Sequence, residues 1–229
     1  EQTPLIAARA VALLREAGVP EDALQLLPGD GPTVGGPLTS DRRIGGVVFT
    51  GSTPTARIIH RGMAEHVPPG APLIAETGGL NAMIVDSTAL PEQAVRDVLA
   101  SAFQSAGQRC SALRILYVQR DVAERFEEML FGAMDALTIG KPWDLATDIG
   151  PVIDAEARDG IAAHIAKAEA EGRVAKRLGA PERGAFIGPT VIRVGGIEAL
   201  GEEVFGPVLH IATFEAEELD AVVDAVNAK

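Results

Sequence analysis

Short apolar runs alternate with longer amphipathic segments along this 229-residue chain, and this alternation restricts the folds that the chain can adopt. The apolar runs are expected to be strands, at 44–49, 73–76, 82–85, 114–118, 186–194 and 208–214. The amphipathic segments are expected to be helices, at 4–17, 55–65, 91–106, 121–137, 154–171 and from 217 onward. Strands joined through helices by short loops form parallel sheets covered by helices. The sequence therefore predicts an α/β fold with a largely parallel sheet.

The charge balance and the cysteine content exclude several classes of protein. The formal net charge is -12, which repels phosphate backbones and anionic membrane surfaces, so we expect no contact with nucleic acid. The apolar runs are too short to span a membrane, and the N-terminus does not resemble a secretory signal. A single cysteine excludes an internal disulfide and a metal site built from several cysteines, and it fits the reducing cytoplasm. We expect no metal site.

The single cysteine, Cys110, lies in the stretch Phe-Gln-Ser-Ala-Gly-Gln-Arg-Cys. Most lone cysteines are small buried hydrophobic residues. Cys110, however, follows Gly107 at the end of a predicted helix, in a turn before a strand and next to Arg109. A turn exposes the sulfur, and a neighbouring cation favours the nucleophilic thiolate. The residues alone leave a nucleophile and a buried side chain as equal alternatives.

Glu76 ends an apolar run and is followed by Thr77 and two glycines, Gly78 and Gly79. A carboxylate in such a place is most often a solvated strand end. The two glycines, however, allow backbone or ligand to approach closely. A partly desolvated Glu76 would be suited to act as a general base near neutral pH.

Two further turns combine glycine with polar side chains. Phe49-Thr50-Gly51-Ser52-Thr53 lies between an apolar strand and a helix, where N–H groups and hydroxyls can meet a pyrophosphate. Its plain alternative is an ordinary helix cap.

Glu202-Glu203-Val204-Phe205-Gly206-Pro207 offers a carboxylate for ribose hydroxyls and a ring for a flat heterocycle. In isolation, that segment is better explained as an acidic surface turn.

The order of these four motifs resembles the aldehyde dehydrogenase superfamily. Phe-Thr-Gly-Ser-Thr, Glu-x-Gly-Gly, Phe-x-x-x-Gly-Gln-x-Cys and Glu-x-Phe-Gly-Pro follow one another as they do in that family, and the likeness covers the whole chain. Within the superfamily, the segments from Ala75 to Val95 and from Ser101 to Arg114 are most similar to the 1-pyrroline-5-carboxylate dehydrogenase module of bifunctional proline utilization A proteins. These enzymes oxidise L-glutamate γ-semialdehyde to glutamate with NAD.

The resemblance implies a role for four residues in the chemistry. Cys110 would attack the small-molecule aldehyde, with its own N–H group helping to hold the oxyanion. Glu76 would activate the water that hydrolyses the resulting thioester. Ser111 matches a position that touches the substrate carboxylate, and Arg109 would add positive potential beside it.

The resemblance also implies an NAD site. Ser52 would lie near the pyrophosphate and Thr77 would line the cofactor site. Glu203 would bind the nicotinamide-side ribose, and Phe205 would pack by the nicotinamide ring. Glu1 would contact the adenosine ribose, where a carboxylate repels a 2′-phosphate and so favours NAD over NADP.

The same likeness predicts an incomplete nucleotide-binding domain over 1–80 and a catalytic α/β domain over 81–229. The family's oxyanion-hole Asn and ribose-binding Lys would precede Glu1, and its Gly-rich substrate-anchoring loop would follow Lys229. Ala56 replaces a glycine of the family, a mild departure. We therefore expect a fragment whose isolated form binds NAD weakly and is inactive, whereas the full-length protein is expected to form homo-oligomers.

Other functions stay open at this point. The chain could come from another semialdehyde dehydrogenase, or it could be a truncated scaffold without catalytic activity. A cysteine hydrolase is the remaining alternative, but none of the four histidines lies in a motif typical of a Cys–His pair. They are His60, His66, His164 and His210.

Overall fold

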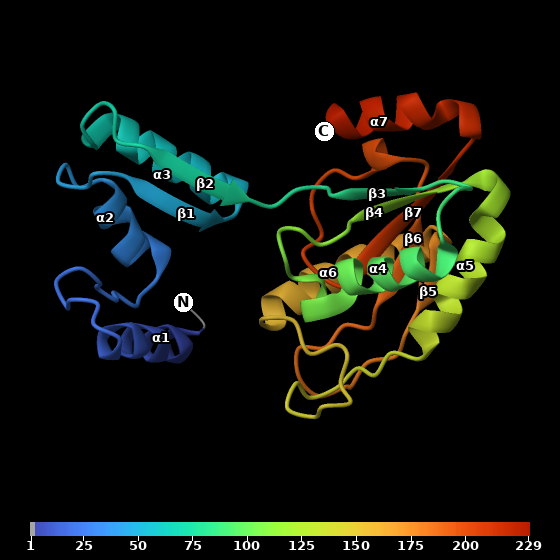
Figure 1. Ribbon diagram of the computed structural model, residues 1–229, viewed down its shortest axis with the longest axis horizontal. Coiled ribbons are helices and arrows are strands. Elements are labelled where there is room, and N and C mark those ends of the chain that lie inside the picture. Colours follow the sequence, from blue (N-terminus) through green and yellow to red (C-terminus); the bar gives the residue numbers. More distant parts are fainter. Residues whose placement is uncertain (1–2) are drawn as a thin grey trace. The chain divides into compact units, whose positions relative to one another are not determined.

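The computed structural model describes residues 3–229, and the chain divides into two compact units that span 1–77 and 78–229 (Figure 1). The division falls close to the predicted boundary after residue 80. Strands and helices alternate in both units, so the predicted α/β fold class is confirmed. Among the described residues, no helix is long and apolar enough to cross a membrane.

The first unit is built around two parallel strands joined by a helix. Its elements are α1 (Pro4–Glu16), a π-helical turn η1 (Gly31–Gly35), α2 (Gly36–Thr39), β1 (Val47–Gly51), α3 (Thr53–His66) and β2 (Leu73–Thr77). In register, Thr50 of β1 lies opposite Glu76 of β2. Ser52 caps α3, because its hydroxyl accepts a hydrogen bond from the Thr55 N–H at 3.2 Å. The helix therefore begins at Thr53, slightly earlier than predicted, and the carboxyl end of β1 leads directly into its first turn.

The second unit contains a five-stranded sheet in the order β3-β4-β7-β6-β5. Its strands are β3 (Ala82–Val85), β4 (Ile115–Gln119), β5 (Val174–Arg177), β6 (Thr190–Arg193) and β7 (Val208–Phe214). The first four strands in spatial order run parallel, as predicted, and β5 pairs with β6 in the antiparallel direction. Strand β5 has no apolar run in the sequence and was not predicted, because it carries Lys176 and Arg177. Such charges on an edge strand disfavour pairing with another chain.

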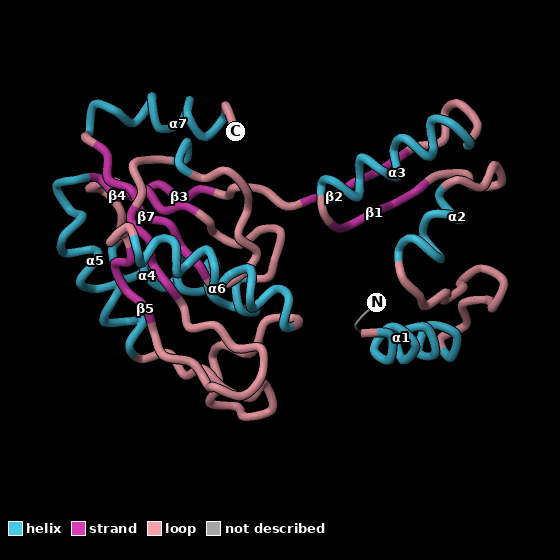
Figure 2. Tube along the Cα trace, turned by 180° about the vertical axis from the view of Figure 1, so that it is seen from behind, coloured by secondary structure: helices cyan, strands magenta, loops and turns pink. Residues whose placement is uncertain are grey.

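Helices cover both faces of this sheet (Figures 1 and 2). One face packs against α4 (Pro91–Phe103), α5 (Arg120–Asp135) and α6 (Ala155–Ala170), and this larger core includes Leu116 and Val118 of β4. The alternate residues of β4, Ile115 and Tyr117, point into a smaller core. That core is covered by the short helix η3 (Ile197–Ala199) and by α7 (Leu219–Asn227), which follows the turn η4 (Ala216–Glu218).

Tyr117 fixes η3 to the underlying sheet. Its side chain is 3% exposed, and its hydroxyl oxygen accepts a hydrogen bond from the Ile197 N–H at 2.7 Å. Burial raises the pKa of the phenol, while the hydrogen bond from Ile197 acts in the opposite direction. The hydroxyl is therefore the partner of an N–H group that is buried with it.

Tyr117→Phe should lower the free energy of unfolding by about 1–3 kcal/mol, because the buried N–H of Ile197 would lose its partner. Urea unfolding followed by circular dichroism measures the change. A loss below about 0.5 kcal/mol, typical of neutral surface substitutions, would contradict this role of the hydroxyl.

Candidate active site

Cys110 lies on a turn whose backbone is held in an unusual conformation. After α4 ends at Phe103, Ser105 and Ala106 both have φ of +54°, and Gly107 follows at +66°. Residues with a Cβ rarely adopt this left-handed conformation, and Ala106 does so while buried. These three residues redirect the chain, and Cys110 emerges as an exposed thiol. The alternative of a buried, inert cysteine is therefore wrong.

Two motif glycines account for the close packing of this turn. A Cβ at Gly107 would overlap the carbonyl of Gly206 and approach the Ala102 carbonyl oxygen at 2.8 Å. A Cβ at Gly206 would in turn overlap Ile161. The Gly-Gln-x-Cys and Glu-x-Phe-Gly-Pro motifs, which are far apart in the sequence, thus meet backbone to backbone.

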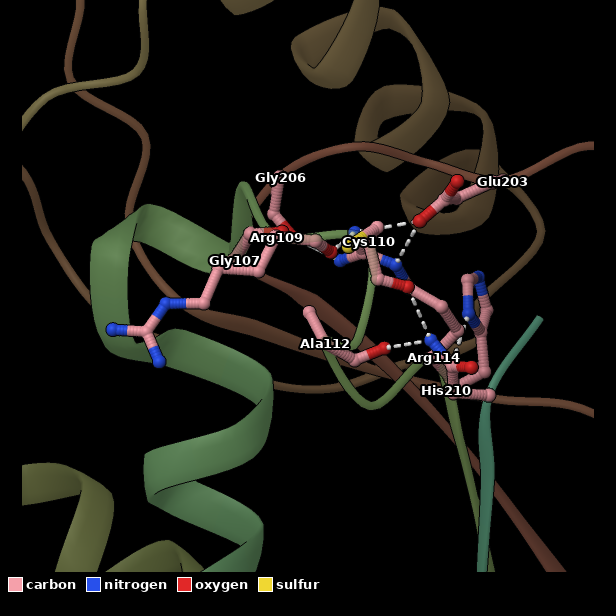
Figure 3. A network of polar contacts seen from close by, with 9 residues as sticks. Gly107, Arg109, Cys110, Ala112, Arg114, Glu203, Gly206 and His210 are labelled. Carbon is pink, nitrogen blue, oxygen red and sulfur yellow. Dashed lines mark hydrogen bonds and ion pairs between the residues drawn. The ribbon is translucent and has the colours of Figure 1, made fainter. Parts of the chain in front are cut away.

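Arg114 connects the two motifs. Its side chain is 1% exposed, and its Nη1 donates to the carbonyl oxygens of Gly107 at 2.8 Å and Gly206 at 3.2 Å. Its Nη2 donates to the Arg109 carbonyl oxygen at 3.1 Å. Glu203 Oε1 accepts from Nε at 2.9 Å and lies 2.8 Å from Nη2 (Figure 3). Burial lowers the pKa of Arg114, and the ion pair with Glu203 opposes that change.

Asn81 holds the other half of the turn. Its Nδ2 donates to the carbonyl oxygens of Cys110 at 2.8 Å and Ala112 at 3.0 Å. Carbonyls of the Cys110 turn are therefore bound by two side chains, Asn81 and Arg114. Within the described residues, the N–H group of Cys110 has no hydrogen-bond acceptor, so it can donate to an oxyanion formed beside its own sulfur.

Glu203 is not an ordinary surface acid. Its side chain is 17% exposed, and Oε1 is occupied by Arg114. Its Oε2 lies against Gly78, where a Cβ would overlap it. Phe205 is 42% exposed, and its ring centroid lies 5.3 Å from the Arg114 guanidinium carbon. The exposed side of this ring is available to a flat ligand.

The remaining residues predicted around Cys110 also lie on this turn. Arg109 and Ser111 are exposed, and Arg109 Nε donates to Ser105 Oγ at 3.1 Å. Gln108 accepts a hydrogen bond from the Ile153 N–H at 2.9 Å. Gln108 therefore ties the turn to the segment before α6, and the substrate-binding roles of Arg109 and Ser111 stay predictions.

The first unit carries the other predicted residues. Ser52 lies at the N-terminus of α3, while Glu76 and Thr77 are the last residues of β2. Glu76 is exposed, so the partial desolvation that we expected is not found within its own unit. Ala56, in the first turn of α3, is buried. Glu1 lies outside the described residues.

Arg114 and Asn81 belong to the site although they lie outside the four motifs found in the sequence. Arg114 could have been found, because it is an arginine directly before the apolar strand Ile115–Gln119, and a charge buried there needs a partner. Asn81 gives a weaker signal. Its role depends on two carbonyls that lie about thirty residues further along the chain.

A buried histidine, His210, binds the backbone carbonyl of Arg114. His210 of β7 is 3% exposed, and its Nδ1 lies 3.0 Å from the Arg114 carbonyl oxygen. A carbonyl can only accept, so Nδ1 carries the proton and Nε2 accepts from His164 Nε2 at 3.1 Å. Burial lowers the pKa of His210 to about 4. The hydrogen bond to the Arg114 carbonyl opposes this shift, and the charges of His164, Arg173 and Arg114 add to it. Burial also lowers the pKa of His164.

Known proteins match this chain along its whole length. Residues 1–229 match the family model described as the aldehyde dehydrogenase family. The bifunctional protein PutA of Klebsiella aerogenes is 54% identical over 239 residues, which cover 100% of this chain and 18% of that protein. The 1-pyrroline-5-carboxylate dehydrogenase of Bacillus cereus is 35% identical over 233 residues, which cover 98% of this chain and 44% of that protein. The chain thus spans less than half the length of these relatives.

Solved structures show the same likeness. A mutant of proline utilization A from Bradyrhizobium japonicum matches with a TM-score of 0.95 and 54% identity, over 100% of this chain and 23% of that one. A betaine aldehyde dehydrogenase mutant from Staphylococcus aureus, solved in complex with NAD+, matches with a TM-score of 0.89 and 32% identity. That match covers 98% of this chain and 46% of the other.

The lowered pKa of His210 predicts a loss of stability in mild acid. The unfolded chain takes up a proton at His210 below about pH 6.5, whereas the folded chain does so only near pH 4. The free energy of unfolding should therefore fall as the pH drops from about 6.5 to 4, by on the order of 3 kcal/mol from this group. His210→Asn should reduce the difference in urea stability between about pH 7 and pH 5, since the titrating ring is removed.

His60→Gln, at an exposed position, is the matched control and should keep the pH dependence of the unaltered chain. If His210→Asn keeps that dependence as well, the histidine does not titrate as its burial requires.

Proposed function

Because the chain belongs to the aldehyde dehydrogenase family, we propose that it supplies the nucleophile and the general base of an NAD-dependent enzyme that oxidises L-glutamate γ-semialdehyde to L-glutamate. The observation that carries this proposal is the turn of Cys110. It presents an exposed thiol and an N–H group that has no acceptor among residues 3–229, while Arg114 and Asn81 bind its carbonyls. The substrate is proposed from the names of the relatives, which include a 1-pyrroline-5-carboxylate dehydrogenase.

The residues present fit a nicotinamide dinucleotide. In the first unit, β1 leads into α3, whose first-turn N–H groups suit a pyrophosphate, and Ser52 stands at that helix end. In the second unit, Glu203 keeps Oε2 free of Arg114, and Phe205 exposes its ring. We propose that these residues hold NAD together with Thr77 and with Glu1. When bound, NAD supplies a hydride acceptor.

The chemistry of the chain's own residues follows from this arrangement. The Cys110 thiolate adds to the aldehyde carbon and forms a thiohemiacetal, whose oxyanion accepts a hydrogen bond from the Cys110 N–H. Loss of hydride to the cofactor leaves a thioester on Cys110. Glu76 takes a proton from water, the hydroxide adds to the thioester carbon, and the thiolate leaves as the carboxylic acid forms.

A nucleophilic thiol must stay reduced, which favours the cytoplasm. We propose a homo-oligomer in the full-length protein, because aldehyde dehydrogenases assemble in this way. The isolated chain is expected to bind NAD weakly and to be inactive, because the nucleophile, oxyanion donors, cofactor and substrate anchor must all be positioned together.

Cys110→Ala in the complete open reading frame should abolish NADH formation with glutamate semialdehyde while leaving NAD affinity almost unchanged. The nucleophile would be lost, whereas the proposed cofactor contacts would remain. Absorbance assays and calorimetry measure the two quantities. Because Cys110 is the single cysteine of this chain, alkylation with iodoacetamide should mimic the substitution if no cysteine elsewhere reacts. Turnover in the variant would exclude the mechanism, and activity with other semialdehydes alone would change the substrate.

Glu76→Gln should slow thioester hydrolysis more than hydride transfer, because the amide cannot accept the proton of the attacking water. Stopped-flow measurements should then show a burst of NADH followed by slow turnover. Glu65→Gln, an exposed substitution in α3 of the same unit, should retain normal turnover. Disappearance of the burst in Glu76→Gln would mean that Glu76 acts before hydride transfer, for example on the Cys110 thiol.

A further inference from the structure

We propose that Arg114 is a positioning residue that holds the Cys110 turn and the Glu203–Gly206 turn as one piece, so that nucleophile and cofactor-binding carboxylate are set by a single guanidinium. This inference rests on the proposed function for the roles of Cys110 and Glu203. The clamp itself rests on contacts within the second unit. Figure 3 shows its members side by side.

The Arg114 guanidinium makes four hydrogen bonds and one further ion-pair contact. A guanidinium has five N–H donors in a fixed fork. Nη1 binds the carbonyls of Gly107 and Gly206, Nη2 binds the Arg109 carbonyl and faces Glu203, and Nε binds Glu203. Two of the three carbonyls belong to the nucleophile turn, and the third belongs to the same turn region as Glu203. The guanidinium therefore binds both turns at once.

A lysine cannot replace this fork. Its ammonium group has three donors on a flexible stem, so it can pair with Glu203 but cannot also bind carbonyls on both turns. The clamp thus depends on the shape of the guanidinium as well as on its charge. Arg114→Lys separates the two properties, because it keeps the charge and removes the fork.

Gly78 limits Glu203 from the other side. A Cβ at Gly78 would overlap Glu203 Oε2, and the carboxylate cannot withdraw without breaking its contacts with Arg114. The neighbouring Gly79 has no such restriction, because its nearest atom to an added Cβ is Asn81 Oδ1 at 3.9 Å. Neither glycine has the positive φ at which an alanine would be strained. Gly78→Ala therefore disturbs the clamp without altering Arg114, and Gly79→Ala is its matched control.

The first experiment measures hydrogen exchange in the 229-residue chain, where no activity is needed. Amides at Gln108, Ala112 and Gly206 are bonded within the two turns and report on their opening. In Arg114→Lys, peptides that cover 104–113 and 202–208 should both exchange about tenfold faster, as expected when contacts to a charged group are lost. Arg193 forms a bidentate ion pair with Glu127 in the same unit. Arg193→Lys makes the same substitution there and should leave the exchange rates of both segments unchanged.

Gly78→Ala should accelerate exchange in the same two segments, and Gly79→Ala should not. This second variant keeps the inference testable if Arg114→Lys does not fold. Unchanged exchange in both segments, or faster exchange in one segment alone, would overturn the clamp. That outcome stands whether or not the wild-type enzyme oxidises glutamate semialdehyde, so failure of the proposed function is seen separately.

The second experiment measures kinetics in the complete open reading frame. Loosening both turns should lower kcat about 100-fold, the effect of a small misplacement of a reacting group, and raise the KM for NAD about tenfold. The dissociation constant of NAD, measured by calorimetry, should rise with that KM. A residue that only supports the fold would lower the unfolding midpoint and leave these constants at the Arg193→Lys values. Full activity in Arg114→Lys would show that charge alone suffices, which contradicts the clamp.

Discussion

A guanidinium buried to 1% exposure is tolerated only where its charge and its N–H groups are all matched, and the candidate site is arranged around this requirement. Arg114 obtains its counter-charge from Glu203 and its carbonyl acceptors from the turns on either side. Because these acceptors come from segments about 90 residues apart, satisfying one side chain brings two sequence motifs together. The polar interior thus fixes the shape of the site.

The conformation of the turn that carries Cys110 depends on the same contacts. Ser105 and Ala106 occupy left-handed backbone conformations that cost about 1–3 kcal/mol each. Such a backbone persists where neighbouring contacts determine it, and here Arg114, Asn81 and the Gly206 backbone supply those contacts. The left-handed conformation turns the chain after α4, and the Cys110 thiol is exposed as a result. A regular helix end would have carried the cysteine in another direction.

The sheet explains why the site lies at this end of the second unit. The residues before β4 and β7 are Arg114 and the Glu203–Pro207 segment, and these two strands are adjacent and parallel. Parallel pairing therefore brings both segments to the same sheet edge. His210 of β7 links its ring and its backbone N–H to the Arg114 carbonyl, which ties the sheet to the clamp.

The sequence by itself determined the α/β class, most strand positions and the family, because hydrophobic periodicity and four glycine-containing motifs are local properties of the chain. Cys110, Glu76 and Glu203 could be named for the same reason, and the roles of all three remain predictions. Only the tertiary structure decided that Cys110 is exposed, that Glu203 is paired with Arg114, and that Asn81 binds the nucleophile turn. These facts depend on contacts between residues far apart in sequence, which periodicity and spacing do not record. A buried charge within an apolar run signals that a partner exists, but the fold alone selects the partner.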